Sequence, residues 1–114
     1  MITQQLKDAW LAELRNPANK QVRNTLFEEN VDCAYSPHRQ YEAVLSAKCM
    51  CALGCLIKAH AKNSNEKTYQ HKQIQHALHP DIKFEIISMN DDRYRSFSEI
   101  ADWVKEVVKV GVIG

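Results

Sequence analysis

Hydrophobic residues recur with a helical period near the start of the chain. Leu6, Trp10 and Leu14 are spaced four residues apart and therefore share one face of a helix. Thr3 precedes this face and can cap its first turn. The residue before a proline is disfavoured in the helical region, so Pro17 marks the end of the element. The pattern predicts a first helix between Thr3 and Pro17.

The longest apolar stripe lies in the middle of the chain. Ser36 and Pro37 supply a helix start, with serine at the cap and proline at the first helical position. Apolar residues then follow at positions 41, 44, 45, 49, 52, 53, 56 and 57. This stripe predicts one central core helix that ends near Ala61.

Three other segments have ambiguous patterns. Segment 18–35 fits either a short amphipathic turn or, over 31–35, a short strand, and it allows a small β-hairpin near 22–35. A short helix over about 68–78 would place two apolar residues on one face. Segment 81–90 is compatible with a strand or a helix, and the polar residues after it predict a turn.

The last predicted helix has the clearest start signal. Ser96 and Glu99 have the spacing of a capping box, and Gly111 fits a helix terminator. We expect the apolar face of this helix to be buried. That face comprises Ile100, Trp103, Val104, Val107 and Val108.

Length and composition add a domain prediction. With 114 residues, 45% of them hydrophobic, the chain can form one core without metal or disulfide support. We therefore expect a single domain over residues 1–114 that is mainly α, with four or five helices and room for the small β-hairpin.

Net charge and targeting signals limit the kinds of partner and the cell compartment that we expect for this protein. The net charge of +1 disfavours a dedicated nucleic-acid binder. No apolar run is long enough to span a membrane, so we expect no membrane partner. The first residues have no basic region followed by an apolar stretch, so we expect a cytoplasmic protein with reduced thiols.

The cysteines are the main candidates for catalysis. Cys49 or Cys51 could act as a nucleophile, but on one continuous helix Cys51 and His60 point about 180° apart. Cys49 and His60 share a face but lie about 16 Å apart along the axis. A base would have to be one of His38, His71, His76 and His79. A helix that begins near Cys49 would instead lower the pKa of that thiol through its dipole. Buried cysteines that act as small core hydrophobes are the favoured interpretation.

A metal site is a second interpretation of the same residues. Cys49, Cys51 and Cys55 supply three soft ligands, and Cys33 or a histidine could supply a fourth. In one helix, however, Cys49 and Cys51 diverge by about 160°. The spacing also lacks the paired Cys-x2-Cys of zinc ribbons, and Asn90-Asp91-Asp92 lacks the glycine and repeated oxygen ligands of a calcium loop. We expect no metal and no cofactor.

Three segments resemble a group of small, functionally uncharacterised proteins encoded by phages and prophages. Segment Trp10 to Arg15 is similar to the opening helix of that group, and Cys51-Ala52-Leu53-Gly54-Cys55-Leu56 is similar to its cysteine-leucine-glycine helix. Met89-Asn90-Asp91 and the segment from Ser96 to Trp103 match its Leu-Asn-Asp turn and final helix. This chain has Cys49-Met50-Cys51-Ala52 in place of an adjacent cysteine pair, and a histidine-rich stretch in place of a central tryptophan segment.

The resemblance implies a mostly helical fold, favours a helix over 81–89 and places the chain in a phage or prophage context. It implies no activity. Small size, little charge bias and the lack of a coherent catalytic set favour a non-enzymatic protein that binds a host or phage protein in the cytoplasm of the host cell. The alternatives are a small cysteine-dependent enzyme and a zinc-stabilised module.

Overall fold

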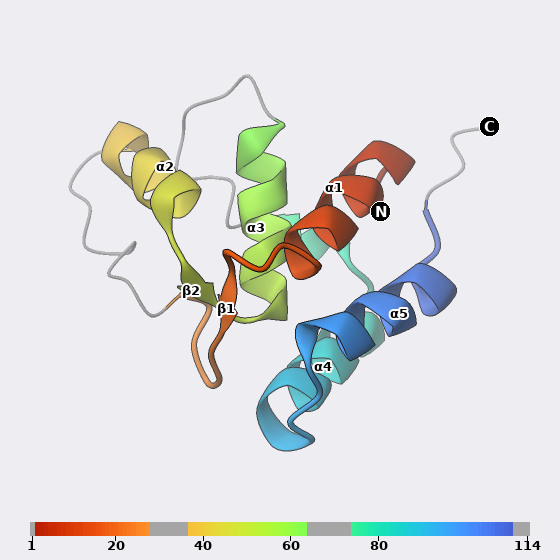
Figure 1. The fold of residues 1–114 in the computed structure, drawn as a ribbon. Coiled ribbons are helices and arrows are strands. Elements are labelled where there is room, and N and C mark those ends of the chain that lie inside the picture. The colour runs from red at the N-terminus through yellow and green to blue at the C-terminus, as the bar shows by residue number, and fades with distance from the viewer. Residues whose placement is uncertain (1, 28–36, 64–73, 111–114) are drawn as a thin grey trace.

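A computed structural model of the chain describes residues 2–27, 37–63 and 74–110 (Figure 1). The mainly helical prediction is confirmed, because this part contains five α-helices and one short sheet. The helices are α1 (Gln4–Leu14), α2 (Pro37–Ser46), α3 (Ala52–Lys62), α4 (Pro80–Ile87) and α5 (Phe97–Val107). A π-helical turn, η3 (Ser88–Asp92), continues α4, and the strands are β1 (Lys20–Gln21) and β2 (Cys49–Met50).

Helix α1 forms as its sequence predicts and packs against α3 and α5. The Thr3 hydroxyl accepts a hydrogen bond from the Leu6 backbone N–H at 3.1 Å, which caps the first turn. Trp10 is fully buried. The Lys7 ammonium donates to the carbonyls of Lys105 and Val108 at the far end of α5, where a cation complements the helix dipole.

The prediction of one continuous central helix is wrong. Strand β2 separates α2 from α3, because the backbone there bonds to β1 and the segment after it instead of extending a helix. The Val22 N–H donates to the Met50 carbonyl at 2.9 Å, and the Cys51 N–H donates to the Leu26 carbonyl at 3.0 Å. The apolar stripe is real, but two helices share it.

The described residues contain a small β element, and most of the segment expected to form a hairpin, near 22–35, lies outside them. Strands β1 and β2 pair in parallel, with Lys20 opposite Cys49, and Phe27 forms an antiparallel bridge with Met50. The predicted strand over 31–35 lies outside the described residues. So does most of the predicted helix over 68–78, of which 74–77 form a single 3-10 turn.

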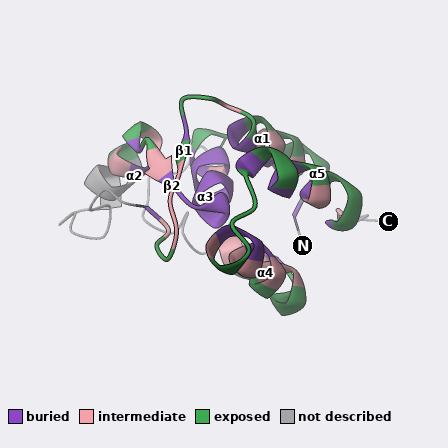
Figure 2. Ribbon diagram, turned by 60° about the horizontal axis from the view of Figure 1, so that its bottom comes forward, coloured by how far each residue is buried: buried purple, intermediate pink, exposed green. Residues whose placement is uncertain are grey.

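Helix α3 lies at the centre of the core. Every residue from Ala52 to Ala59 is buried, and α1, α2 and α4 all contact this helix (Figures 1 and 2). Gly54 allows the close approach of the segment around Leu26. Helix α3 is therefore the element that fixes the positions of the others.

The C-terminal third contains α4 and α5, joined through η3, which contacts both. Segment 80–87 is a helix, and the His79 imidazole accepts a hydrogen bond from the Asp81 N–H at its start. The Ser96 and Glu99 capping box of α5 is confirmed. Helix α5 ends at Val107, ahead of the predicted terminator Gly111, which lies outside the described residues.

Candidate functional site

The cysteines are placed around the start of α3. Cys49 lies in β2, Cys51 is the N-cap residue of α3, and Cys55 lies in its first turn, all three as free thiols. Burial raises the pKa of the Cys51 thiol, although the backbone N–H groups of Leu53 and Gly54 act in the opposite direction. Burial raises the pKa of Cys55 strongly as well. Helix α3 begins at Ala52, after Cys51 and not at Cys49, and at Cys51 desolvation outweighs the effect of the backbone N–H groups of the helix start.

The structure does not bring His60 to these thiols as a base. Cys51 precedes the first residue of α3 and His60 lies in its last turn, about 13 Å farther along the axis. His79 caps α4 and is largely exposed, as is His76. The side chains of His38 and His71 lie outside the described ones.

A shared metal site is likewise not assembled by the described residues. No group of three or more His, Cys, Asp or Glu side chains in residues 2–27, 37–63 and 74–110 is placed to hold an ion. Cys33 lies outside these ranges.

Asn90 has a structural role that the sequence did not reveal. The side chain is 1% exposed, and its Oδ1 accepts hydrogen bonds from the Ala52 N–H and the Gln21 amide. Its Nδ2 donates to the Val22 carbonyl and to Asp91. The polar turn expected here is instead a buried junction of β1, α3 and η3.

A second buried polar cluster joins α1 to α3. The Lys58 ammonium donates to the Asn19 side chain at 2.9 Å and to the Ala47 carbonyl at 2.7 Å. Asn19 in turn donates to Glu13, whose carboxylate also accepts from Lys62. These hydrogen bonds give the buried charged and polar groups partners inside the protein, as buried groups of this kind require.

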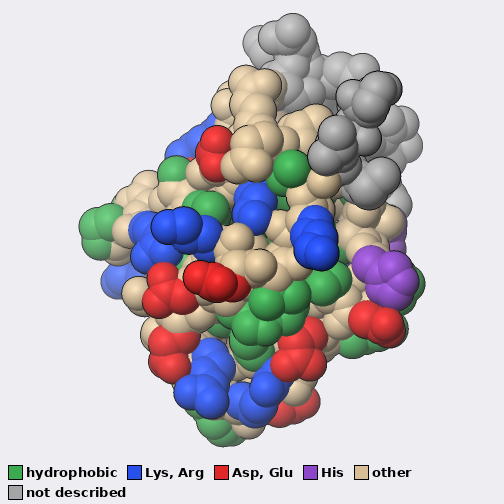
Figure 3. Space-filling model, turned by 90° about the vertical axis from the view of Figure 1, so that its right-hand side faces the viewer, with side chains coloured by type: hydrophobic (Ala, Val, Ile, Leu, Met, Phe, Trp, Pro, Cys, Tyr) green, Lys and Arg blue, Asp and Glu red, His purple; other side chains and the backbone are tan. Residues whose placement is uncertain are grey.

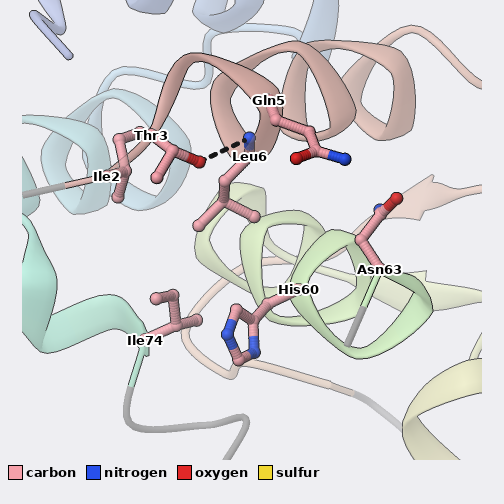
Figure 4. Close-up of a pocket in the computed structure, with 7 residues that line it drawn as sticks. All are labelled: Ile2, Thr3, Gln5, Leu6, His60, Asn63 and Ile74. Atoms are coloured by element: carbon pink, nitrogen blue, oxygen red, sulfur yellow. Dashed lines mark hydrogen bonds between the residues drawn. The ribbon is translucent and has the colours of Figure 1, made fainter. Parts of the chain in front are cut away.

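One pocket lies between the start of α1 and the end of α3 (Figure 4). It has a volume of about 300 Å³ and is lined by Ile2, Thr3, Gln5, Leu6, His60, Asn63 and Ile74. The Thr3 hydroxyl accepts from Leu6, and the Asn63 amide donates to the Ala59 carbonyl. The described lining offers a hydroxyl, two amides and an imidazole but no thiol or carboxylate.

Two hollows lie between α4 and α5 on the described surface. One hollow, of about 340 Å³, is lined by Ile2, Ala77, Leu78, His79, Ile82, Val107, Val108 and Lys109. A second, of about 240 Å³, is lined by Glu85, Met89, Arg93, Arg95, Glu99 and Trp103. Ile82 and Glu85 are one helical turn apart on α4, as are Trp103 and Val107 on α5, so the two hollows are neighbours along the same pair of helices. Together they are here called the α4–α5 groove.

The groove corrects the expectation that the whole apolar face of α5 is buried. Ile100 and Val104 are fully buried, but Trp103 is only half-buried and Val107 is 39% exposed. On this side of the molecule, hydrophobic side chains gather with acidic side chains on either side and basic ones above and below (Figure 3).

Comparisons with family models, curated proteins and solved structures found no match to this chain. In the part of the chain that the structure describes, there is no helix with both the length and the apolar character needed to cross a membrane.

Proposed function

We propose that this protein acts by binding another protein through the α4–α5 groove and the outer surface of α4. In keeping with the phage or prophage resemblance, the proposed partner is a host or phage protein in the cytoplasm of the host cell. The raised pKa values of the Cys51 and Cys55 thiols favour this function over an enzyme that uses either of these thiols as its nucleophile.

The main support for the proposal is that most of the apolar side chains of α4 are incompletely buried. This helix has four large apolar side chains, Ile82, Phe84, Ile86 and Ile87, yet only Ile86 is buried. Phe84 is 63% exposed. A helix with such a composition is normally covered on more than one side, so α4 has the character of one partner in an interface.

The residue types around α4 support the same function. Trp103 and Met89 line the groove, and Phe84 lies on the outer surface of α4. Tryptophan, phenylalanine and methionine are enriched in protein interfaces, where a few such residues contribute most of the binding energy. Single exposed apolar residues are common on any surface, but here they accompany a concave apolar groove.

Affinity purification of the tagged protein from its own host, followed by native mass spectrometry, tests this function. We expect one partner in a fixed stoichiometry with the wild-type chain, and its loss in Val107→Lys and Phe84→Lys. Ala12→Lys places the same charge on an exposed position of α1 and should retain the partner. Recovery of no stoichiometric partner, or equal recovery by all three variants, would contradict the proposal.

A further inference from the structure

We infer that Arg23 and Tyr94 form a further contact site for the partner protein, in which the Arg23 guanidinium binds a carboxylate of the partner. The inference rests on the proposed function and adds a contact made by two residues outside the linings of the two hollows. It follows from an arginine without an acceptor, an exposed tyrosine in an unfavourable backbone conformation, and the rigid support of both residues.

Arg23 lacks the ion pair that the other described arginine side chains have. Arg15, Arg93 and Arg95 each pair with a carboxylate, whereas in the described part of the chain no such pair includes Arg23, and its Nε is buried without an acceptor. Its guanidinium carbon lies 4.6 Å from the centroid of the Tyr94 ring. This stacking uses a face of the guanidinium plane and leaves the terminal N–H groups at its edge for an acceptor. A carboxylate fits that edge, because it can accept two parallel hydrogen bonds from it.

Tyr94 is exposed in a backbone conformation that tyrosine rarely adopts. Its φ is 52°, in the left-handed region, and the residue is 69% exposed. The Cβ of a bulky residue is crowded by the backbone in this region, and residues held there cluster at binding sites. Tyr94 also lies two residues after η3, and π-helical turns occur frequently at functional sites. A contact outside the chain therefore explains why tyrosine occupies this position.

Hydrogen bonds connect the segments that carry the two residues. The Gln21 amide donates to the Asn90 Oδ1 at 2.9 Å and to the Arg95 carbonyl at 2.7 Å. The Asn24 backbone N–H donates to Asp91 at 3.0 Å, which holds Asn24 in the left-handed region as well, at a φ of 65°. Such a supported pair is organised before the partner arrives, so binding orders few additional groups.

The pair is near the α4–α5 groove. Tyr94 is the residue between Arg93 and Arg95, which both line the second hollow and already have carboxylate partners. A partner that occupies this hollow is therefore within reach of the pair, where Arg23 is the arginine that still needs an acceptor. Arginine and tyrosine are also among the residue types that contribute most to protein interfaces.

Carbodiimide coupling of Arg23→Lys tests the contact directly. The reagent joins an amine to a carboxylate that touches it, and an amide forms while the carbodiimide takes up the released water as a urea. The complex is captured from the host through the tagged chain, coupled and digested, and mass spectrometry identifies the joined residues. We expect an amide between the lysine at position 23 and an aspartate or glutamate of the partner. Ala12→Lys, at an exposed position of α1, should give no amide to the partner.

Two further variants separate a binding role from a structural one. Arg23→Gln should reduce recovery of the partner at least fivefold, whereas Arg15→Gln, which removes the same charge from an exposed pair on the other side of α1, should retain it. Tyr94→Gly should also reduce recovery, but its thermal unfolding midpoint should equal or exceed that of the wild type, because glycine adopts the left-handed conformation without strain. A purely structural role would lower the midpoint and leave recovery unchanged.

The inference is overturned if Arg23→Gln and Arg15→Gln recover the partner equally, if the lysine at position 23 forms no amide with the partner, or if Tyr94→Gly loses only stability. Loss of the partner after phosphatase treatment of the lysate would show that the guanidinium binds a phosphate and not a carboxylate. A partner that depends on Val107 and Phe84 but not on Arg23 would leave the proposed function standing without this contact. Recovery of no partner by the wild-type chain would contradict both.

Discussion

The backbone of Ala52 connects residues that are far apart in the sequence. Its carbonyl accepts the Trp10 indole N–H, and its N–H donates to Asn90 at 3.1 Å. The segments around residues 10, 52 and 90 therefore meet at this point. The sequence identifies Trp10 as a core residue from its spacing, but spacing along the chain cannot show that Asn90, 38 residues from Ala52, is buried beside it.

Removal of the Asn90 side chain tests this junction. Asn90→Ala leaves the buried Ala52 N–H and the Val22 carbonyl without a side-chain partner, so we expect a loss of roughly 2–4 kcal/mol in the free energy of unfolding. Asn63→Ala removes a more exposed amide from the end of α3 and should cost less than about 1 kcal/mol. Urea denaturation measures both values, and equal losses would contradict a special role for Asn90.

The buried thiols predict a dependence of stability on alkaline pH. Because the pKa of Cys55 is raised in the folded state, the folded protein keeps this proton above pH 9.0 while the unfolded chain releases it. The free energy of unfolding should therefore fall as the pH rises above about 9, with a slope of up to about 1.4 kcal/mol per pH unit from this group.

Urea denaturation at pH 8, 9 and 10 measures this slope. Cys55→Ala is the matched variant, because the other titrating groups of the chain are unchanged in it. The slope should be shallower in Cys55→Ala than in the wild type, whatever the stability lost at pH 8. Identical slopes would show that Cys55 titrates normally.

At the level of elements, local signals predict helix ends better than they predict helix continuity. The Thr3 cap and the Ser96 capping box act between residues three positions apart, so the sequence contains all the information needed. The break between α2 and α3 depends on hydrogen bonds from residues 20–27 to residues 48–51, and the stripe of apolar residues continues across it. Periodicity alone therefore predicts one helix where there are two.

At Gly54, inside α3, a contact with a segment far away in the sequence again decides which residue fits. In an unconstrained helix, Gly→Ala is stabilising by about 1 kcal/mol. Here an alanine Cβ would lie 2.5 Å from the Leu26 carbonyl oxygen and 2.8 Å from the Met50 Cβ, so we expect Gly54→Ala to destabilise the protein by about 1–3 kcal/mol.

The thermal unfolding midpoint of Gly54→Ala, compared with that of the wild type, shows whether the substitution destabilises or stabilises the protein. Ser98→Ala, at an exposed position of α5, is the control and should leave the midpoint nearly unchanged. A Gly54→Ala protein that melts at a higher temperature than the wild type would show that the contact with Leu26 is not tight.

At the level of the whole molecule, the sequence predicts the helical fold and most of the core but not the groove. Hydrophobic periodicity shows which face of α5 is apolar, and it cannot show whether another element covers that face. Trp103 and Val107 belong to the same stripe as the fully buried Ile100 and Val104. They remain accessible because the hollows between α4 and α5 leave that edge of the stripe uncovered.

Photo-crosslinking in the host cell tests the central claim most directly. A benzoylphenylalanine residue at position 107 lies in the groove, and the same residue at position 12 lies on the exposed face of α1. The proposed function predicts a crosslink to one partner protein from position 107 and none from position 12. No crosslink from position 107, or the same products from both positions, would contradict it.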